Sequence, residues 1–196
     1  MTTRRKLMGL IAALAVLAPL PLFLASCKTL TDEEVKNAMQ IEILETKWVM
    51  KEYRQWPNPK LILVPSVVFR IKNLTADSLA YVSFNGIFKE RNAVENRGDN
   101  FRAAIGKNNA VAPGGWSDPI TLKSNFGTEG MNVRTFQNNP QWKPIWVRIF
   151  VQWKGSQHVL LGEWPVAMTI DFKEPEQAVI QGGKKEGEIK KDETKK

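Results

Sequence analysis

One stretch decides the fold of this chain: Leu61-Ile62-Leu63-Val64-Pro65-Ser66-Val67-Val68-Phe69-Arg70-Ile71-Lys72. Every second residue from Leu61 to Ile71 is apolar, while Arg70 and Lys72 fall on the opposite side. Successive side chains of a strand alternate between the two faces of its sheet, so a period of two is typical of a β-strand with one buried face.

The same alternation recurs from residue 40 to residue 173, and no long helical period competes with it. The expected buried faces comprise Leu44, Thr46, Trp48, Met50, Ala80, Val82, Phe84, Gly86, Phe88, Ile120, Leu122, Val147, Ile149, Val151, Trp153, Val159 and Leu161. A last long strand is expected over residues 166–172, with Pro165 at a bulge or an edge, and residues 101–105 add a short edge strand.

Turn residues separate these segments, most clearly Lys154-Gly155-Ser156-Gln157, which predicts a hairpin between Trp153 and His158. The sequence therefore predicts an all-β fold for residues 40–173. The specific expectation is an antiparallel, immunoglobulin-like β-sandwich of six to seven strands.

Composition limits the classes of protein and site that are possible. The chain has 196 residues, 28 Lys and Arg against 20 Asp and Glu, and a formal charge of +8. With 43% hydrophobic and 24% charged residues it has the composition of an ordinary globular protein. A single Cys excludes a disulfide framework or a Cys-based zinc site within one chain, and a single His makes a His-based metal site improbable.

The first 26 residues have the pattern of an export signal. Arg4, Arg5 and Lys6 precede twenty residues without charge, from Leu7 to Ser26. An uncleaved anchor helix is the alternative, since this apolar run is just long enough to span a bilayer. We therefore expect a signal helix over residues 1–26.

The run ends in Leu24-Ala25-Ser26-Cys27, which resembles the lipobox of bacterial lipoprotein precursors at all four positions. The resemblance implies cleavage before Cys27 and attachment of a diacylglyceryl group to its sulfur. With further acylation of the new amino terminus, the anchor would be stable. Lys28, in place of the Asp that retains lipoproteins in the inner membrane, indicates release to the outer membrane. The paired Arg4-Arg5 leaves a twin-arginine export route open beside the general one.

Both flanks of the β-rich body carry their own signals. In residues 27–39, Thr31 and Glu34 have the spacing of a capping box, which predicts a short helical spacer after the lipidated Cys27. At the other end, residues 174–196 are rich in Lys and Glu, and we expect this tail to be disordered because it has too little apolar surface to bury.

A weaker resemblance concerns residues 61–124. Val67-Val68-Phe69-Arg70-Ile71-Lys72-Asn73, the later Val82-Ser83-Phe84-Asn85-Gly86-Ile87-Phe88 and the turn Ala112-Pro113-Gly114-Gly115 look like envelope domains of the FxLYD or LEA-14 kind. The aromatic-Leu-Tyr-Asp string of that family is absent here. Domains of this kind are mostly binding or accessory modules, so the resemblance implies a fold more than an activity.

Candidate binding residues come from Trp and other apolar residues in loops. Trp48, Trp153 and Trp164 fall on apolar strand faces and are expected in the core. The long connection 124–141 is typical of a binding loop that folds over its own apolar residues as a lid. The expected ligand- or partner-binding residues are Trp56, Trp116, Phe126, Met131, Phe136 and Trp142.

Chemistry-bearing motifs are sparse. His158 stands beside a turn without a nucleophile suggested by any local motif, so we expect no catalytic residue and no metal site. Removing residues 1–26 lowers the formal charge from +8 to +5, which is spread along the chain and predicts no nucleic-acid partner. Arg97-Gly98-Asp99 spells the integrin-binding tripeptide and Asn73-Leu74-Thr75 a glycosylation sequon, and both patterns arise often by chance.

The sequence thus predicts a lipid-anchored lipoprotein of the bacterial envelope, on the outer membrane and facing the periplasm. Its expected role is non-catalytic binding or scaffolding for an envelope protein partner, with the lipid on Cys27 and no other cofactor. Two alternatives remain open at this stage. One is a periplasmic carrier or sensor of an apolar or sugar ligand that uses residues 124–142, and the other is an envelope hydrolase built on His158 or a carboxylate pair.

Overall fold

The structure, a computed structural model, describes residues 29–140 and 142–175, and in this part of the chain two short helices accompany nine strands. The elements in chain order are α1 (Asp32–Ala38), β1 (Met39–Arg54), β2 (Lys60–Asn73), β3 (Val82–Lys89), β4 (Asp99–Ile105), β5 (Ile120–Lys123), β6 (Thr128–Gly130), α2 (Val133–Gln137), β7 (Trp146–Trp153), β8 (Val159–Pro165) and β9 (Ile170–Asp171). The expected signal helix, Cys27 and the tail from residue 176 onward lie outside the described residues.

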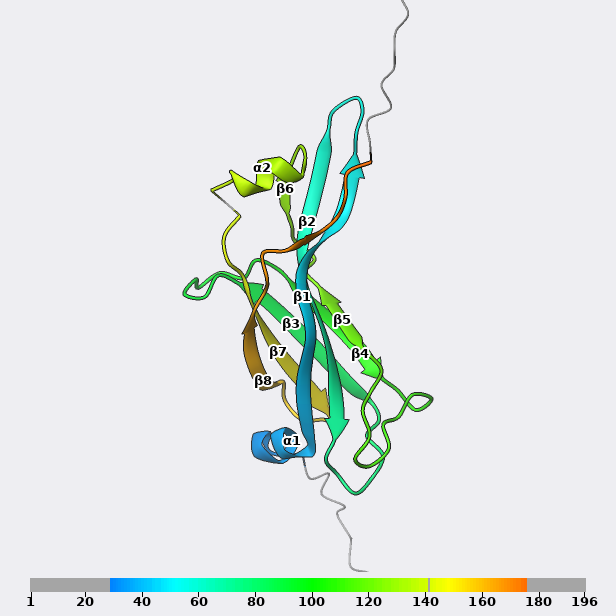
Figure 1. Ribbon diagram of the computed structural model, residues 1–196. Coiled ribbons are helices and arrows are strands. Elements are labelled where there is room, and N and C mark those ends of the chain that lie inside the picture. The colour runs from blue at the N-terminus through cyan, green and yellow to red at the C-terminus, as the bar shows by residue number, and fades with distance from the viewer. Residues whose placement is uncertain (1–28, 141, 176–196) are drawn as a thin grey trace, which may run out of the picture.

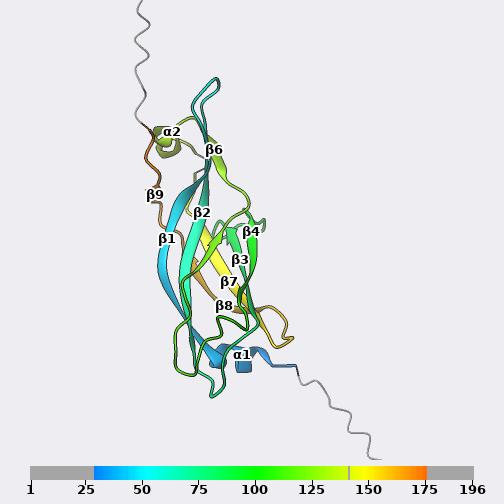
Figure 2. The same cartoon turned by 90° about the vertical axis from the view of Figure 1, so that its right-hand side faces the viewer.

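Two sheets pack face to face as a sandwich-like body (Figures 1 and 2). One has the order β5-β2-β1-β9, with β6 also paired to β2, and the other has the order β4-β3-β7-β8. All strand pairs are antiparallel except β1 with β9, which run parallel. The protein is therefore mostly β and largely antiparallel, as the alternation predicts.

The core lies between the sheets and is formed by the faces that the alternation selects. In β2, all six apolar positions from Leu61 to Ile71 are buried. Phe69 of β2 meets Phe84 of β3 edge-on with ring centroids 5.2 Å apart, which joins the two sheets at the centre. In β7, the side chains of Val147, Ile149 and Val151 are completely buried.

β1 departs from the predicted alternation. Irregularities between Ile43 and Glu45 and between Met50 and Glu52 interrupt its register with β2. Leu44 lies at the first bulge and Met50 beside the second, and both are exposed, at 43% and 42%, although they were expected on the buried face.

The predicted last strand over residues 166–172 is also wrong. β8 ends at Pro165, and the chain then crosses from one sheet to the other, where only Ile170 and Asp171 pair with β1. Pro165 closes an edge strand, as its missing N–H requires, whereas the pairing beyond it is parallel rather than antiparallel.

The capping box predicted at Thr31 and Glu34 is formed at the start of α1. The helix ends at Ala38, and its Val35 is completely buried in the core. α1 is therefore part of the folded body rather than a free spacer. None of the helices in the described part of the chain has the length and apolar character that a membrane crossing requires.

The hairpin of β1 and β2 continues beyond the sandwich as an arm, defined here as residues 50–63 with β6 and α2 packed beside them (Figures 1 and 2). β1 has 16 residues and is therefore about 50 Å long. α1 lies at one end of the molecule and the tip of the arm at the other. The region where the arm leaves the sandwich is called the junction below.

Candidate functional site

A bulged detour of the chain shapes the junction. β5 and β6 both pair with β2, and the N–H of Ser124 still donates to the carbonyl of Pro65 at 3.0 Å, but residues 125–127 leave the ladder. A Cβ on Gly127 would lie 2.5 Å from the carbonyl oxygen of Leu63, so only glycine allows the backbone to pass this close to β2. The detour brings Phe126 out to the surface, where 70% of the residue is exposed.

The connection between β3 and β4, residues 90–98, is tied to this detour. Asn125 exchanges hydrogen bonds with Asp99: the N–H of Asp99 donates to Oδ1 of Asn125 at 3.0 Å, and Nδ2 of Asn125 donates to Asp99 at 2.9 Å. The hydroxyl of Ser124 also donates to the carbonyl of Arg97 at 3.1 Å. These bonds are called the latch below. They hold the Arg97-Gly98-Asp99 tripeptide by contacts within the protein itself.

A cavity of about 190 Å³ lies between the latch, the sandwich and the arm. Its lining comes from five separate segments of the chain: Trp48, Pro65, Asn96, Arg97, Phe126, Gly127, Thr128 and Ile145. The site is mixed in character, because aromatic and aliphatic side chains form the inner wall while Asn96 and Arg97 are exposed at the rim.

An aromatic cluster supports the inner wall. Trp48 is 2% exposed and meets Trp142 edge-on at 5.9 Å, and Phe136 of α2 meets the same Trp142 at 6.0 Å. The indole Nε1 atoms of Trp48 and Trp142 are buried and have no hydrogen-bond partner within the described residues. A buried N–H without a partner costs about 1–3 kcal/mol, so these two donors lower the stability of the folded protein locally.

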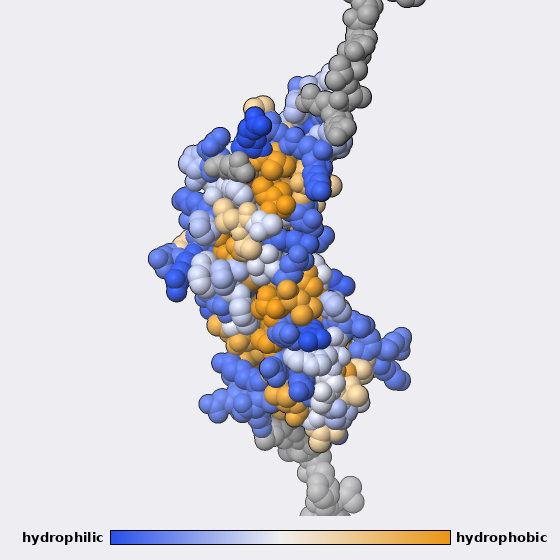
Figure 3. Space-filling view, in the orientation of Figure 1, coloured by the Kyte–Doolittle hydropathy of each residue, from blue (hydrophilic) through white to orange (hydrophobic). Residues whose placement is uncertain are grey.

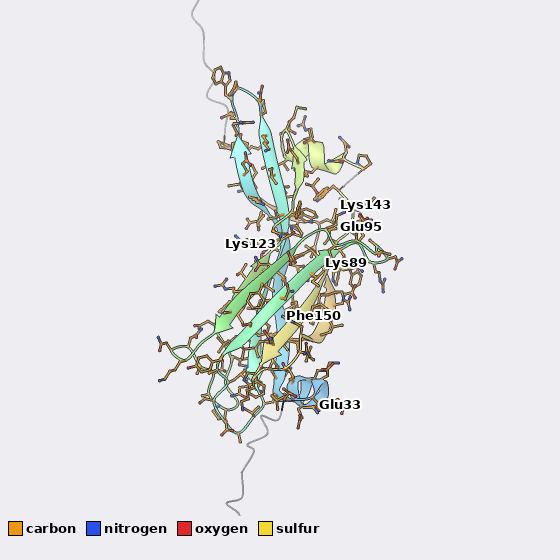
Figure 4. All side chains as sticks on the ribbon, turned by 180° about the vertical axis from the view of Figure 1, so that it is seen from behind. Glu33, Lys89, Glu95, Lys123, Lys143 and Phe150 are labelled. Carbon is orange, nitrogen blue, oxygen red and sulfur yellow. The ribbon has the colours of Figure 1, made fainter. Side chains whose placement is uncertain are left out.

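The rim carries a compact charge network. Glu90 lies 2.6 Å from Arg97 and 3.4 Å from Lys143. The hydrogen bond from Arg97, assisted by Lys143, holds the pKa of the Glu90 carboxyl below its ordinary value of 4.5 despite partial desolvation. In Figure 4, Lys143 lies near Lys89 and Glu95 at the junction end of the β4-β3-β7-β8 sheet, and Glu33 of α1 lies at the opposite end.

The structure brings together three of the six residues predicted for binding. Phe126 lines the cavity, and Trp142 and Phe136 belong to the cluster behind its wall. Phe136 is completely buried, so it supports the site without facing a ligand directly. The predicted loop is itself interrupted by β6 and α2, and part of it packs as a small folded flap rather than an open connection.

The other three predicted residues lie elsewhere. Trp56 is 83% exposed at the tip of the arm, and Met131, between β6 and α2, is 60% exposed. Trp116 pairs with Lys72 by an isolated bridge, and the Arg70 guanidinium lies 4.3 Å from the centre of its ring. These three residues share no site with the cavity.

Sequence reasoning missed Trp48, Arg97 and Ile145 as cavity residues. Trp48 follows the strand alternation and was expected only in the core, a position that the structure confirms. Nothing in its local sequence signals that this part of the core borders a cavity. For Arg97, the one available signal was its place in a connection rich in charged residues.

His158 lies at the turn between β7 and β8 and is exposed. Its ring meets that of Phe101 edge-on, with the two ring centroids 6.4 Å apart. A hydrolase built on this residue requires a histidine inside a cleft, which is not its position here. In the described ranges no group of three or more His, Cys, Asp and Glu residues is placed to hold a metal ion.

No protein-family model matches this chain, and no match was found among curated proteins. Among solved structures, the chain is distantly similar to the X-ray structure of Northeast Structural Genomics Consortium target SoR45, with 12% sequence identity and a TM-score of 0.38. The match covers 68% of this chain and 89% of that one.

Proposed function

We propose that the protein is a lipid-anchored lipoprotein of the bacterial envelope that works as a non-catalytic binding module. Cys27 carries the lipid, the body is an immunoglobulin-like sandwich, and the domain faces the periplasm from the outer membrane. The junction cavity, with exposed Phe126 at its entrance, is the surface that engages an envelope protein partner.

The size of the cavity supports a protein partner over a carried small molecule. Sites for small molecules and cofactors have volumes of about 300–1,000 Å³, whereas the junction cavity has about 190 Å³. It therefore suits one side chain of a partner better than a whole ligand. Aromatic residues that surround a desolvated pocket are typical of the points that dominate binding energy at protein interfaces.

The shape of the molecule suits an anchor at the amino-terminal end. α1 follows Cys27 closely in the sequence, and the arm projects from the opposite end (Figure 1). A lipid on Cys27 would therefore hold the α1 end against the membrane and leave the junction and the arm accessible from the periplasm.

Site-specific photo-crosslinking in a Gram-negative host tests this role. A photoreactive phenylalanine analogue is placed at Phe126, and in a second variant at Tyr81 as a control. Both residues are 70% exposed, and Tyr81 is outside the cavity lining. We expect a discrete protein adduct from position 126 and none from position 81. Equal labelling at both positions, or none at position 126, would contradict binding at the junction.

A further inference from the structure

The latch separates the junction cavity from a second opening in the molecule. β4 and β5 are the edge strands of the two sheets on one side of the sandwich, and they lie side by side (Figure 1). Within the described residues no strand pairing joins them, but hydrogen bonds do so at two points. One is the latch, from Asn125 to Asp99, and in the other Nη1 of Arg102 donates to the carbonyl of Thr121 at 3.2 Å. The opening, called the edge recess below, is lined by Asn100, Phe101, Arg102, Thr121 and Lys123.

Three exposed cations surround the latch and the edge recess. Arg102 and Lys123 line the recess, and Nζ of Lys51 donates to the carbonyl of Asn125 in the latch. None of the three forms an ion pair with an acid of the described chain. The latch itself contributes one acid, Asp99, whose carboxylate accepts a hydrogen bond from Asn125. The local charge is therefore positive and is available to a binding partner.

The cations lie close to the entrance of the junction cavity. Lys123 precedes Phe126 by three residues, a span of at most about 11 Å in a fully extended chain. In Figure 4, Lys123 lies at the junction. Exposed aromatic rings flank the latch on both sides, Phe126 at the cavity and Phe101 at the edge recess. One segment of a partner can therefore contact the cavity and the cations together.

Hydrophobic surface alone does not single out one binding place. The face shown in Figure 3 has separate apolar areas, beside the arm and over the middle of the sandwich, with hydrophilic side chains between them. The surroundings of the latch differ because exposed aromatic rings lie next to uncompensated positive charge. At protein interfaces, complementary charge increases the rate of association and suppresses wrong partners.

We propose that the partner bound at the junction presents an acidic segment, in which one apolar side chain enters the cavity and Asp or Glu residues about three positions away pair with Lys123, Arg102 and Lys51. This inference rests on the proposed function and specifies the charge of the partner. A strand advances about 3.3 Å per residue, so three residues cover the distance from Phe126 to Lys123. Arg102 uses one donor for the carbonyl of Thr121, and its guanidinium has further donors for a carboxylate.

The ends of this chain do not have the charge that the site selects. Residues 1–28 contain four Lys and Arg and no Asp or Glu, and residues 176–196 contain six Lys against five Asp and Glu. Both segments therefore have a net positive charge, which disfavours binding beside three cations. The acidic segment has to belong to another molecule.

A second copy of this chain is a poor match as well. A two-fold symmetric contact through this surface places the cations of both copies opposite each other, and like charges across an interface oppose association. The exposed acids Asp32 and Glu33 belong to α1, at the end that a lipid on Cys27 would hold at the membrane. A neighbouring copy in the same membrane would present them at the level of its own α1, away from the junction. The head groups of that membrane lie away from the junction for the same reason.

Photo-crosslinking from position 126 in a Gram-negative host, repeated with variants of Lys123, tests the proposal. We expect the yield of the protein adduct to fall about threefold with Lys123→Gln and about tenfold with Lys123→Glu, because charge reversal adds repulsion to the lost ion pair. Lys36→Glu makes the same change of charge at an exposed position of α1 and should leave the yield unchanged. Thermal midpoints within about 2 °C of the wild type would show that the variants fold.

Sequencing of the adduct by mass spectrometry provides a second readout. The partner peptide attached at position 126 should contain Asp or Glu about three residues from the attachment point. Replacing that acid with Lys should lower the yield with the wild-type chain and restore it with Lys123→Glu, since the two charges are then exchanged.

The possible results distinguish this inference from the proposed function. No adduct from position 126 in the wild type would contradict binding at the junction, and the acidic segment would be contradicted with it. An adduct formed equally well with Lys123→Glu would keep the junction as a binding surface and overturn the acidic segment alone. The acidic segment is also overturned if the adduct consists of a second copy of this chain, its own tail or a lipid.

Discussion

Gly98 occupies a backbone conformation that other residues avoid, at the point where the latch closes. Its φ is +120°, and a Cβ would lie 2.2 Å from Oγ of Ser124 and 2.7 Å from Oδ1 of Asn125. Gly98→Ala therefore adds backbone strain to a clash with two side chains of the latch. We expect it to lower the free energy of unfolding by about 3 kcal/mol, measured by urea denaturation of the full chain.

Gly155→Ala is the matched control for this experiment. Gly155 also has a positive φ, +72°, but nothing lies within 4 Å of the position of its Cβ. Its substitution should cost only the left-handed strain, about 1 kcal/mol. If the free energy of unfolding falls equally in the two variants, the clash of a Cβ at position 98 with Ser124 and Asn125 contributes nothing.

Glu90 makes the rim of the cavity sensitive to acid. Since its pKa is lowered by Arg97 and Lys143, its ionised form stabilises the folded state. This contribution is fully present above the ordinary carboxyl pKa of 4.5 and is lost as the pH falls through the depressed value. We expect wild type and Glu90→Gln to differ by less than about 1 kcal/mol at neutral pH, because the pair is partly exposed.

Urea denaturation of both proteins at several pH values checks this sign. The difference in free energy of unfolding should be constant from neutral pH down to about pH 5 and should shrink below it. A difference that grows with acidity would mean that Glu90 is destabilising when ionised.

Asn73 shows why a sequence motif can mislead. Its side chain is completely buried, and its Nδ2 donates to the carbonyls of Asp77 at 2.7 Å and Val111 at 2.9 Å, while its Oδ1 accepts from the N–H and the hydroxyl of Thr75. The residue pattern of a glycosylation sequon therefore serves here as an internal connection between the end of β2 and two loops.

Asn73→Ala should lower the free energy of unfolding by about 2–3 kcal/mol, because it removes the hydrogen bonds that this buried amide makes to Asp77, Val111 and Thr75. Asn92→Ala, at an exposed position, should change it by no more than about 0.5 kcal/mol. Thermal or urea denaturation distinguishes the two, and equal effects would contradict a structural role for the Asn73 side chain.

At the scale of elements, the alternation in the sequence correctly predicts the buried residues wherever a strand is regular and covered on one face. β2, β3 and β7 bury the residues that their alternation selects. β1 was mispredicted at Leu44 because this residue is the extra one of a bulge and has no partner on β2, whereas Trp48 after it is buried as expected, and no pattern in the residues marks the position of the bulge.

The segment 124–141 could not be divided from its sequence because its elements depend on tertiary contacts. A helix as short as α2 is unstable alone. It begins with a capping box between Asn132 and Thr135 and is held by Phe136, which is buried against Trp142. The sequence alone does not indicate that Phe136 packs against Trp142, because Trp142 is positioned by its contact with Trp48 in the folded protein.

Phe136→Ala should detach this flap while leaving the sandwich folded. Removal of a buried phenyl ring costs about 3–5 kcal/mol where the structure cannot relax, and the loss here should be concentrated in β6 and α2. Hydrogen exchange by mass spectrometry should show faster exchange in residues 128–137, with β3 and β7 unchanged. Faster exchange throughout the protein would mean that the flap is part of the cooperative core.

At the scale of the whole molecule, the six predicted binding residues belong to one class of side chain and yet lie in four places. Trp56 is at the tip of the arm, Trp116 is stacked against Arg70, Met131 is on the flap, and the rest are at the junction. Residue type predicted which rings were candidates. Only the topology, which joins residues near 48, 97, 126 and 145, determines which of them share a cavity.

The proposed lipid anchor on Cys27 orients the molecule relative to the membrane. The variant Cys27→Ala tests for this anchor. Expressed in a Gram-negative host, the wild-type protein should lose residues 1–26, gain the mass of acyl chains and sediment with the outer membrane. Cys27→Ala should gain no acyl mass and should not reach that membrane, because one residue supplies the only thiol of the chain. Full precursor mass for both proteins in the inner membrane would instead identify residues 7–24 as an uncleaved anchor. The α1 end would then be tethered to the inner membrane instead of the outer membrane. The arm would point from the inner membrane into the periplasm.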